Sequence, residues 1–329
     1  MKYAIGVDIG GTKISVTLGE PSGKILARRE VPTQTGRKAA DSLKEIIAAI
    51  KEILLEVGVS RKMILGIGVG LPGAVDSRKG LAPRSPNLPG WKGMAVRKIL
   101  QRASGLPVYL ANDANAAALG ESFFGAGKNA KHFIYMTVST GIGGGIIING
   151  QLYEGASFVA GEIGHISVVP DGDRCKCGKR GCLEAYASGT AIASAVRKKI
   201  TSKSLVWKFA TKGKRFDARC VGMAAREGDR LCIESYQKAG YYLGIGLANL
   251  LNVLNPEKIV IGGGVLKSAH KIFWNTMMQS CKKHAWPEAF SAVQIVHSQL
   301  KGHSGDLGAL ALVFHLNSSK ADKCYPDNL

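Results

Sequence analysis

The sequence lacks any uninterrupted apolar run of about 18 residues, so we expect no transmembrane helix. It also lacks the basic region and cleavage site of a secretory signal, because Met1-Lys2-Tyr3 leads directly into an apolar segment. Seven cysteines in 329 residues do not suggest a disulfide framework. These absences predict a protein of the reducing cytoplasm with no membrane partner.

Acidic residues are scarce: 24 stand against 44 lysines and arginines, which gives a formal charge of +20. Such a surplus raises the question of nucleic acid as a partner. Residues 197–230 hold eleven basic and three acidic side chains, but no aromatic stacking pattern or nucleic-acid motif accompanies them. We interpret this segment as a solvated basic face, expect no nucleic-acid partner, and expect the charge to attract anions such as ATP or polyphosphate.

The chain length fits about two domains, and the pattern of elements repeats. In each half a short apolar strand, a glycine turn and a second strand follow one another, and helices come later. Expected strands cover residues 3–9, 13–18, 24–31, 64–69, 107–110, 132–138, 146–148 and 258–261. Expected helices cover residues 39–57, 96–103, 187–200, 235–254 and 305–316. The repeat predicts two related α/β domains that face each other across a cleft. The first covers 1–112 together with the C-terminal helix 305–317, and the second covers 113–304.

The first glycine turn reads Asp8-Ile9-Gly10-Gly11-Thr12-Lys13. Glycines let backbone N–H groups approach phosphate oxygens, and Thr12 adds a hydroxyl donor. Asp8, at the end of the strand, can hold a hydrated Mg²⁺ ion. A plain hairpin has a similar sequence, so this turn alone is weak support for a phosphate site.

Two further glycine runs strengthen the prediction of a nucleotide site. Thr140 to Gly145 forms a matching turn in the second half, and Gly262 to Gly264 follows a buried strand, where it can pack against a purine. The competing interpretation is that all three runs only permit tight turns. Three runs in a chain with duplicated halves favour phosphate and nucleotide binding.

A polar cluster, Asn112-Asp113-Ala114-Asn115, lies where a strand ends and a helix begins. A carboxylate at this place is ordinarily a helix cap. The functional interpretation is that Asp113 is a general base that takes the proton of a hydroxyl attacking phosphorus, while Asn112 holds a neighbouring hydroxyl.

His165, Cys175, Cys177 and Cys182 have the residue types of a closed tetrahedral zinc site, with Glu162 and Glu184 beside them. Glycines between the cysteines allow the tight turns that bring sulfur atoms around one ion. Carboxylates fixed by such a site are suited to recognise or activate hydroxyl groups.

These residues resemble the ROK family of sugar kinases, within the actin-like and hexokinase-like ATPase superfamily. The resemblance extends from about residue 4 to residue 315. The motifs that carry it are Asp8–Lys13, Leu71-Pro72-Gly73, Ser85–Trp91, Asn112–Asn115, Thr140–Gly145, Ala160–His165, Cys175–Glu184 and Gly262–Gly264. It implies two actin-like, ribonuclease H-like α/β domains with a small structural zinc motif.

The resemblance also implies roles for individual residues. Asp113 corresponds to the catalytic base, and the sugar-binding positions are Gly73, Asn87, Asn112, Asp113, Glu162, His165 and Glu184. The nucleotide positions are Asp8, Gly10, Gly11, Thr12, Lys13, Thr140, Gly141, Gly263 and Gly264. The zinc ligands are His165, Cys175, Cys177 and Cys182. The implied partners are a hexose, ATP, Mg²⁺, a structural Zn²⁺ and further copies of the chain in a homodimer or higher homo-oligomer.

Three features depart from the family pattern. The second phosphate turn has Ser139 before Thr140-Gly141, where glycine is common, and Ala74 follows Pro72-Gly73, where proline is usual. The basic segment 201–230 aligns with nothing in the pattern. We expect little harm from Ser139 unless its position needs a positive φ angle.

The resemblance implies an ATP-dependent hexose kinase that transfers the γ-phosphoryl group to the sugar 6-hydroxyl, with a glucokinase as the first choice. Cys175–Glu184 followed by Ala185–Ala191 favours glucose, and N-acetylglucosamine or N-acetylmannosamine is the alternative substrate. A DNA-binding sugar sensor would carry a winged helix before the first phosphate turn, where we expect no room for one. Asp113 and the phosphate turns also argue against a silent sugar-binding protein.

Overall fold

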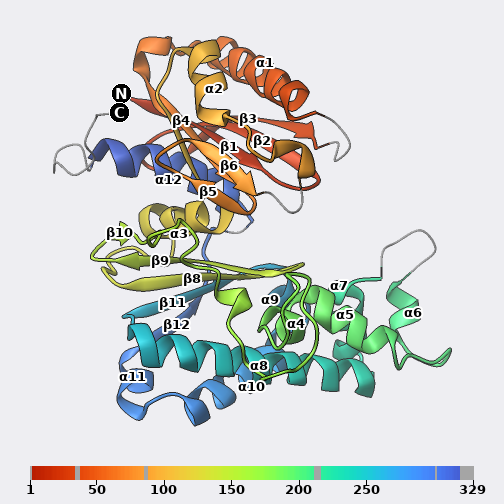
Figure 1. Ribbon diagram of the computed structural model, residues 1–329. Coiled ribbons are helices and arrows are strands. Elements are labelled where there is room, and N and C mark those ends of the chain that lie inside the picture. The colour runs from red at the N-terminus through yellow and green to blue at the C-terminus, as the bar shows by residue number, and fades with distance from the viewer. Residues whose placement is uncertain (1, 34–37, 85–87, 211–215, 301, 319–329) are drawn as a thin grey trace. The chain divides into compact units, whose positions relative to one another are not determined.

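A computed structural model describes residues 2–33, 38–84, 88–210, 216–300 and 302–318 (Figure 1). Its strands are β1 (Tyr3–Ile9), β2 (Lys13–Gly19), β3 (Ile25–Pro32), β4 (Ile64–Leu71), β5 (Ala74–Asp76), β6 (Leu81–Arg84), β7 (Val108–Asn112), β8 (Phe133–Val138), β9 (Ile142–Ile148), β10 (Gln151–Leu152), β11 (Lys258–Gly262) and β12 (Gln294–His297). Its α-helices are α1 (Ala39–Val57), α2 (Val96–Ser104), α3 (Asp113–Phe124), α4 (Glu184–Ala187), α5 (Gly189–Arg197), α6 (Val206–Phe209), α7 (Ala218–Arg226), α8 (Arg230–Leu254), α9 (Gly264–Ser268), α10 (His270–His284), α11 (Pro287–Ala292) and α12 (Ser304–Ser318). Short 3₁₀ helices cover Arg61–Met63, Pro89–Trp91 and Ile163–His165.

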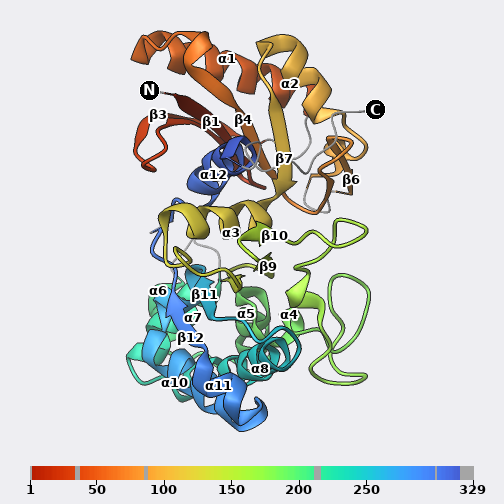
Figure 2. The same cartoon turned by 90° about the vertical axis from the view of Figure 1, so that its left-hand side faces the viewer.

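The first sheet has the strand order β3-β2-β1-β4-β7, in which β1, β4 and β7 are parallel and the β1-β2-β3 pairs are antiparallel. Side chains alternate along β1, so Ile5 and Val7 join the core beneath α1 and α2, whereas Ala4 joins the core beneath α12. Figure 2 shows α1 and α2 on one side of this sheet and α12 on the other. The parallel strands therefore end at one edge between two helical layers.

Helix α12 returns the end of the described chain to the first sheet, where it packs against β1, β4 and α3. Its Gly308 lies directly against Gly120 of α3, since a Cβ at Gly120 would stand 3.0 Å from the Gly308 nitrogen. The two backbones approach this closely because neither residue has a side chain.

The second sheet has the order β10-β9-β8-β11-β12, with β8, β11 and β12 parallel and β9-β10 antiparallel. Helices α8 and α10 pack on each other and share a buried core with β8 and β11 (Figure 1). Phe273 and Met277 of α10 and Leu247 of α8 are fully buried there. This core holds the strand ends that precede the second and third glycine turns.

Packing divides the described residues into two compact units. The first unit draws on Met1–Lys131, Gly145–Gly161 and Ser298–Leu329, and the second on His132–Gly144 and Glu162–His297. Helix α3 thus packs with the first unit, together with α12. The domain boundary that the sequence predicts after residue 112 stays a prediction.

The mixed α/β fold and the repeated strand-turn-strand pattern confirm the fold class expected from the sequence. The structure differs in detail: the expected helix 187–200 is α5, Gly189–Arg197, and the separate turn α4 precedes it. The expected helix 235–254 begins earlier, at Arg230, and the expected strand 146–148 begins earlier, at Ile142. Asp229 caps α8 by accepting a hydrogen bond from the Cys232 nitrogen, which explains the earlier start. Among the described helices, none combines the length and apolar character needed to span a bilayer.

Candidate active site and metal centre

The parallel strands of the first sheet bring two distant acids to one edge. Asp8 of β1 pairs with Gly70 of β4, and Leu71 of β4 pairs with Asn112 at the end of β7. A Cβ on Gly70 would lie 3.7 Å from Asp8 Oδ1 and 3.8 Å from the Asp113 Cα, so these two acids flank the same glycine. The carboxyl ends of parallel strands are where ligands bind in α/β proteins.

Asn112 is the N-cap of α3, and this role changes the interpretation of Asp113. The Asn112 side-chain oxygen accepts hydrogen bonds from the nitrogens of Ala114 and Asn115, and its amide donates to the Gly73 carbonyl at 2.9 Å. Asp113 is the first helical residue, and its Oδ1 accepts from its neighbour Ala114 at 2.8 Å. The capping role that competed with catalysis for Asp113 is therefore filled by Asn112. With both ends of its amide engaged, Asn112 is tied to Gly73.

Asp8 is held in an unfavourable environment for a charged carboxylate. Its pKa is raised from 3.8 to about 7, chiefly by burial and then by the negative charges of Asp306 and Asp113, against the opposing effect of Lys13 and Arg28. The first residues of α12 enclose it, since a Cβ on Gly305 would stand 2.1 Å from Asp8 Oδ2. A divalent cation near Asp8 would offset this excess of negative charge.

The first glycine turn is closed by its own backbone. The Gly10 nitrogen donates a hydrogen bond to the Lys13 carbonyl at 3.0 Å. The Thr33 hydroxyl donates a second one to the Gly10 carbonyl at 2.8 Å. Gly11 has open space at its Cβ position, and Thr12 is exposed. Both residues are accessible to a phosphate group.

A chain of charges connects this turn to α12. Lys13 pairs with Glu30, Arg28 pairs with the same Glu30 at 2.6 Å, and Arg28 Nε donates to Asp306 at 2.9 Å. Asp306 is 4% exposed, so water can do little to stabilise its negative charge. The guanidinium of Arg28 compensates that charge instead. Sequence inspection missed Arg28, Glu30 and Asp306, because no motif marks them and they meet only through the strand pairing and the return of α12.

The second and third glycine turns follow neighbouring parallel strands of the second sheet. Gly262, the last residue of β11, pairs with Thr137 of β8, just before the turn Ser139–Gly141. Gly263 has a φ of 102°, and a Cβ there would stand 2.1 Å from the Val138 carbonyl, so this position requires glycine. The predicted nucleotide residues Thr140, Gly141, Gly263 and Gly264 thus share one edge of this sheet.

The four predicted metal ligands form a compact cluster in the second unit. The ligand atoms of His165, Cys175, Cys177 and Cys182 all lie within 4.8 Å of one another. Cys177 Sγ is 3.7 Å from Cys182 Sγ, and Cys175 Sγ is 3.8 Å from His165 Nδ1. Sulfur atoms about 2.3 Å from a tetrahedral zinc stand about 3.8 Å apart, so the spacing and the donor set fit that ion. The predicted zinc motif is confirmed as a Cys₃His cluster that fits zinc.

The imidazole of His165 has two different neighbours. Its Nδ1 faces Cys175, whereas its Nε2 lies 3.8 Å from the Glu162 carboxylate.

Burial raises the pKa of Cys175 to about 12, and the backbone N–H of Lys179 lowers the pKa of Cys177. Since zinc binds thiolates, loading of the cluster releases protons.

Glu184 connects this cluster to the second glycine turn. Its Oε2 accepts a hydrogen bond from the Ile142 nitrogen at 2.9 Å, and its Oε1 lies 3.9 Å from Cys175 Sγ. A Cβ on Gly141 would stand 2.4 Å from the same Oε2, so a side chain at this position would displace the Glu184 carboxylate. The sequence predicted both residues as site residues but not their contact.

The predicted site residues fall into both compact units. Asp8, Gly10–Lys13, Gly73, Asn112 and Asp113 belong to the first, and Thr140, Gly141, Glu162, His165, Glu184, the three cysteines, Gly263 and Gly264 belong to the second. Asn87 lies outside the described residues.

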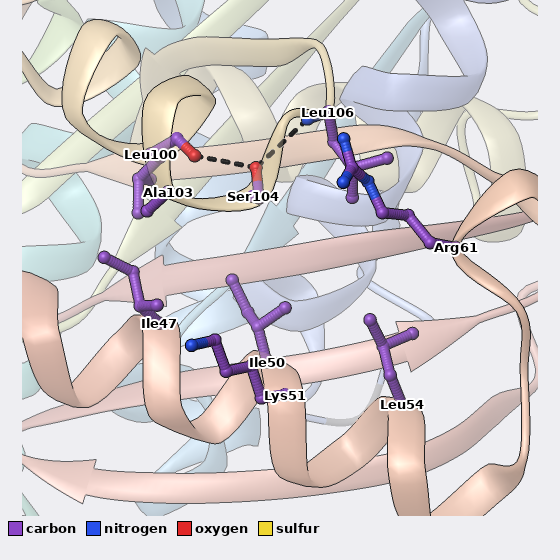
Figure 3. A pocket seen from close by; sticks show the side chains of 9 residues that line it. All are labelled: Ile47, Ile50, Lys51, Leu54, Arg61, Leu100, Ala103, Ser104 and Leu106. Carbon is purple, nitrogen blue, oxygen red and sulfur yellow. Dashed lines mark hydrogen bonds between the residues drawn. The ribbon is translucent and has the colours of Figure 1, made fainter.

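A pocket of about 200 Å³ lies between α1 and α2 (Figure 3). Its lining is mostly apolar, with Lys51 and Arg61 added, and Ser104 bonds to the Leu100 carbonyl and the Leu106 nitrogen beside it. None of the predicted site residues lines it, so it is separate from both phosphate turns.

Sequence comparison finds relatives of two kinds. A glucokinase from Thermotoga maritima is 36% identical over 94% of this chain and 96% of its own length. A xylose repressor from Caldicellulosiruptor bescii is 32% identical over 94% of this chain and 77% of its own length.

Solved structures also match the fold. A ROK hexokinase from Thermus thermophilus superposes with a TM-score of 0.83 at 32% identity, covering 96% of this chain and 99% of that one. A ROK glucokinase from Streptomyces griseus in complex with glucose and AMPPNP gives a TM-score of 0.78 at 33% identity, covering 95% and 99%. Residues 4–315 match the ROK family, as the motifs predicted, and this chain therefore belongs to that family.

Proposed function

We propose that this protein is an ATP-dependent hexose kinase, with glucose as its preferred sugar. The observation that carries the proposal is the convergence of Asp8, the Gly73 loop and Asp113 at the carboxyl edge of the first sheet. Phosphoryl transfer needs positioning, charge neutralisation and one base. At this edge Asp8 can hold the cation that neutralises charge, and Asp113 can act as the base. The similarity to glucokinases and to a glucose- and AMPPNP-bound structure supports the choice of sugar and donor.

In the proposed reaction Asp113 accepts the proton of the sugar 6-hydroxyl while that oxygen forms a bond to the γ-phosphorus of ATP. The bond from that phosphorus to the β,γ-bridging oxygen breaks, and ADP leaves with the bond's electron pair. Backbone N–H groups of Gly10–Lys13 and Thr140–Gly141 would hold the phosphates. Asp8 would hold Mg²⁺ through water, and the ion would neutralise charge on the phosphates. Lys13 would exchange its Glu30 partner for a phosphate.

Sugar recognition is proposed for Glu162, His165 and Glu184, with Asn87 and the Asn112–Gly73 loop. Glu162 and the Nε2 side of His165 lie together, so they can serve neighbouring hydroxyls. The metal would be held by His165, Cys175, Cys177 and Cys182 and would supply a structural cross-link, since four protein ligands leave no open position. A site that pairs each hydroxyl discriminates against sugars that lack one.

The test is a coupled ADP-release assay with ATP and glucose, mannose, fructose, N-acetylglucosamine or N-acetylmannosamine, and sugar-phosphate formation is measured when polyphosphate replaces ATP as donor. We expect glucose to have a kcat/KM at least about tenfold above the other sugars. An N-acetylhexosamine as the best substrate would overturn the choice of glucose. If none of these sugars supports ADP release although sugars bind, the kinase assignment is wrong.

A sugar-responsive regulator is the second candidate, favoured by the 32% identity to a xylose repressor. It predicts sugar binding without turnover and retention of DNA fragments by the purified protein. The catalytic arrangement at Asp113 favours the kinase, and the same assay separates the two. The homo-oligomer that the family resemblance implies stays a prediction, which light scattering of the purified protein can test.

A further inference from the structure

We propose that Glu184 is a positioning residue that fixes the second phosphate turn, so that filling the Cys₃His cluster raises the affinity for ATP. This inference rests on the proposed function, because it assigns a nucleotide-side role to a residue otherwise expected to bind only the sugar. The acceptor is the Glu184 carboxylate, and the group that it fixes is the backbone N–H of Ile142.

The segment that follows the last metal ligand holds the phosphate turn at three points. Glu184 binds the Ile142 nitrogen at 2.9 Å, the Gly189 nitrogen donates to the Ser139 carbonyl at 2.7 Å, and the Thr190 hydroxyl donates to the Thr140 carbonyl at 2.7 Å. The turn therefore takes its shape from residues 184–190. Only Leu183 separates this segment from Cys182.

The contact between Glu184 and the turn is short and enclosed. Ile142 is 5% exposed, so its N–H would have little access to water if the carboxylate were removed. A Cβ on Gly141 would stand 2.4 Å from Glu184 Oε2, so the carboxylate lies directly against the turn. Oε2 faces the turn, whereas Oε1 faces the metal cluster.

The other end of the same carboxylate lies against the metal cluster. Glu184 Oε1 is 3.9 Å from Cys175 Sγ, and the Leu183 nitrogen donates to the Ile166 carbonyl, one residue after His165. The cluster thus fixes both the chain that precedes Glu184 and the surroundings of its side chain. Without an ion, the four ligands are joined only by weak sulfur contacts, so they hold this segment less firmly and the phosphate turn has less support.

The experiment measures ATP affinity directly, by calorimetry without sugar, on metal-loaded protein. Glu184→Ala should weaken ATP binding by about tenfold, the effect expected when a charge-assisted hydrogen bond to a buried N–H is lost. Glu184→Gln keeps an oxygen for Ile142 and should stay within about threefold of the unaltered protein. Glu234→Gln is the matched control, because this acid pairs with Arg230 on the exposed surface of α8 and should leave ATP affinity unchanged.

Two further measurements separate this role from general damage. Metal content should remain one ion per chain in all variants, and hydrogen exchange at the Ile142 amide should accelerate in Glu184→Ala but not in Glu184→Gln. Removing the ion with a chelator should weaken ATP binding to the unaltered protein about as much as Glu184→Ala does, and should weaken that variant no further. If the metal-free protein unfolds, the comparison of the two Glu184 variants decides.

The outcomes distinguish this inference from the proposed function. If the unaltered protein does not bind ATP, the kinase assignment fails. If it binds ATP and Glu184→Ala binds equally well, or if metal removal weakens both proteins alike, the kinase assignment stands and the positioning role of Glu184 is wrong.

Discussion

The side-chain amide of Asn112 donates a hydrogen bond to the Gly73 carbonyl at 2.9 Å, while its oxygen caps α3. One side chain therefore connects the loop after β4 to the start of the helix that carries Asp113. Because Asn112 supplies the cap, Asp113 can be altered without removing the feature that begins the helix. This separation of roles makes the two positions independently testable.

Asp113→Asn should abolish turnover while sugar and ATP still bind. The amide keeps the size of the side chain and an oxygen for the Ala114 nitrogen but cannot take a proton, and a general base contributes about 10²–10⁴-fold to the rate. Steady-state kinetics should show the loss in kcat, and calorimetry should show glucose affinity within about threefold. A variant with near-normal kcat would rule out Asp113 as the base.

Asn112→Ala and Asn112→Asp should differ in stability. Alanine removes both the cap and the Gly73 contact, at a cost of about 1–2 kcal/mol in the free energy of unfolding. Aspartate keeps the cap oxygen but places a second acceptor against the Gly73 carbonyl, so it should lose less stability than alanine and show a raised KM for the sugar. Urea denaturation together with kinetics checks both. Equal losses of stability would show that capping is not the role of Asn112.

The environment of the Asp8 carboxyl group leads us to expect that the protein without Mg²⁺ loses stability as the pH rises. Its pKa is raised from 3.8 to about 7, so the folded state favours the protonated acid. The stabilising contribution of the protonated form is complete below about pH 4 and is lost as the pH rises through 7. The difference between 3.8 and about 7 sets an upper bound of about 4 kcal/mol.

Asp8→Asn should therefore stabilise the protein without Mg²⁺ at pH 8 and change its stability little at pH 4. The same substitution should weaken Mg²⁺-dependent turnover. Urea denaturation at the two pH values measures this, with Glu52→Gln on the exposed face of α1 as a control that should show no such pH dependence. Lower stability of Asp8→Asn at pH 8 would contradict the predicted environment of the carboxyl group.

The Cys₃His cluster should hold about one zinc per chain at neutral pH and release it on acidification, because protons compete for the thiolates. Cys177→Ser should lose the ion together with stability. Cys220→Ser is the control, since Cys220 is a buried thiol outside the cluster whose contact with the Phe209 carbonyl a serine hydroxyl can keep. Zinc analysis of freshly purified proteins checks this. An unaltered protein without zinc would contradict the assignment of the metal.

The sequence was most informative where backbone geometry limits the choice of residue. Gly263 has a positive φ and no space for a Cβ, and a turn follows each of β1, β8 and β11 as predicted. The second turn is shorter than predicted, because Gly143–Gly145 lie within β9. The cluster of His165 with three cysteines was likewise predictable, because ligand types and glycine spacing are local features.

Contacts that depend on the path of the chain could not be predicted. Glu184 and Ile142 are 42 residues apart, and nothing in either segment indicates their hydrogen bond. Arg28 reaches Asp306 only because α12 returns to the first sheet. The starts of α4 and α8 were also misjudged, since a four-residue helix lacks periodicity and the Asp229 cap lies within a charged segment.

The carboxylate of Glu121 in α3 is fully buried, although it has no assigned role in the reaction. Its Oε1 accepts from the Ser298 hydroxyl, just after β12, and its Oε2 accepts from the Ala126 nitrogen at 2.8 Å. Glu121→Ala should cost about 3 kcal/mol or more in the free energy of unfolding, since it leaves a cavity and strands two donors. Glu121→Gln should cost only about 1 kcal/mol, because its oxygen can serve Ala126 while its amide donates to Ser298. Urea denaturation of the two variants measures the difference. Equal and small costs would show that the buried carboxylate does not hold these two segments together.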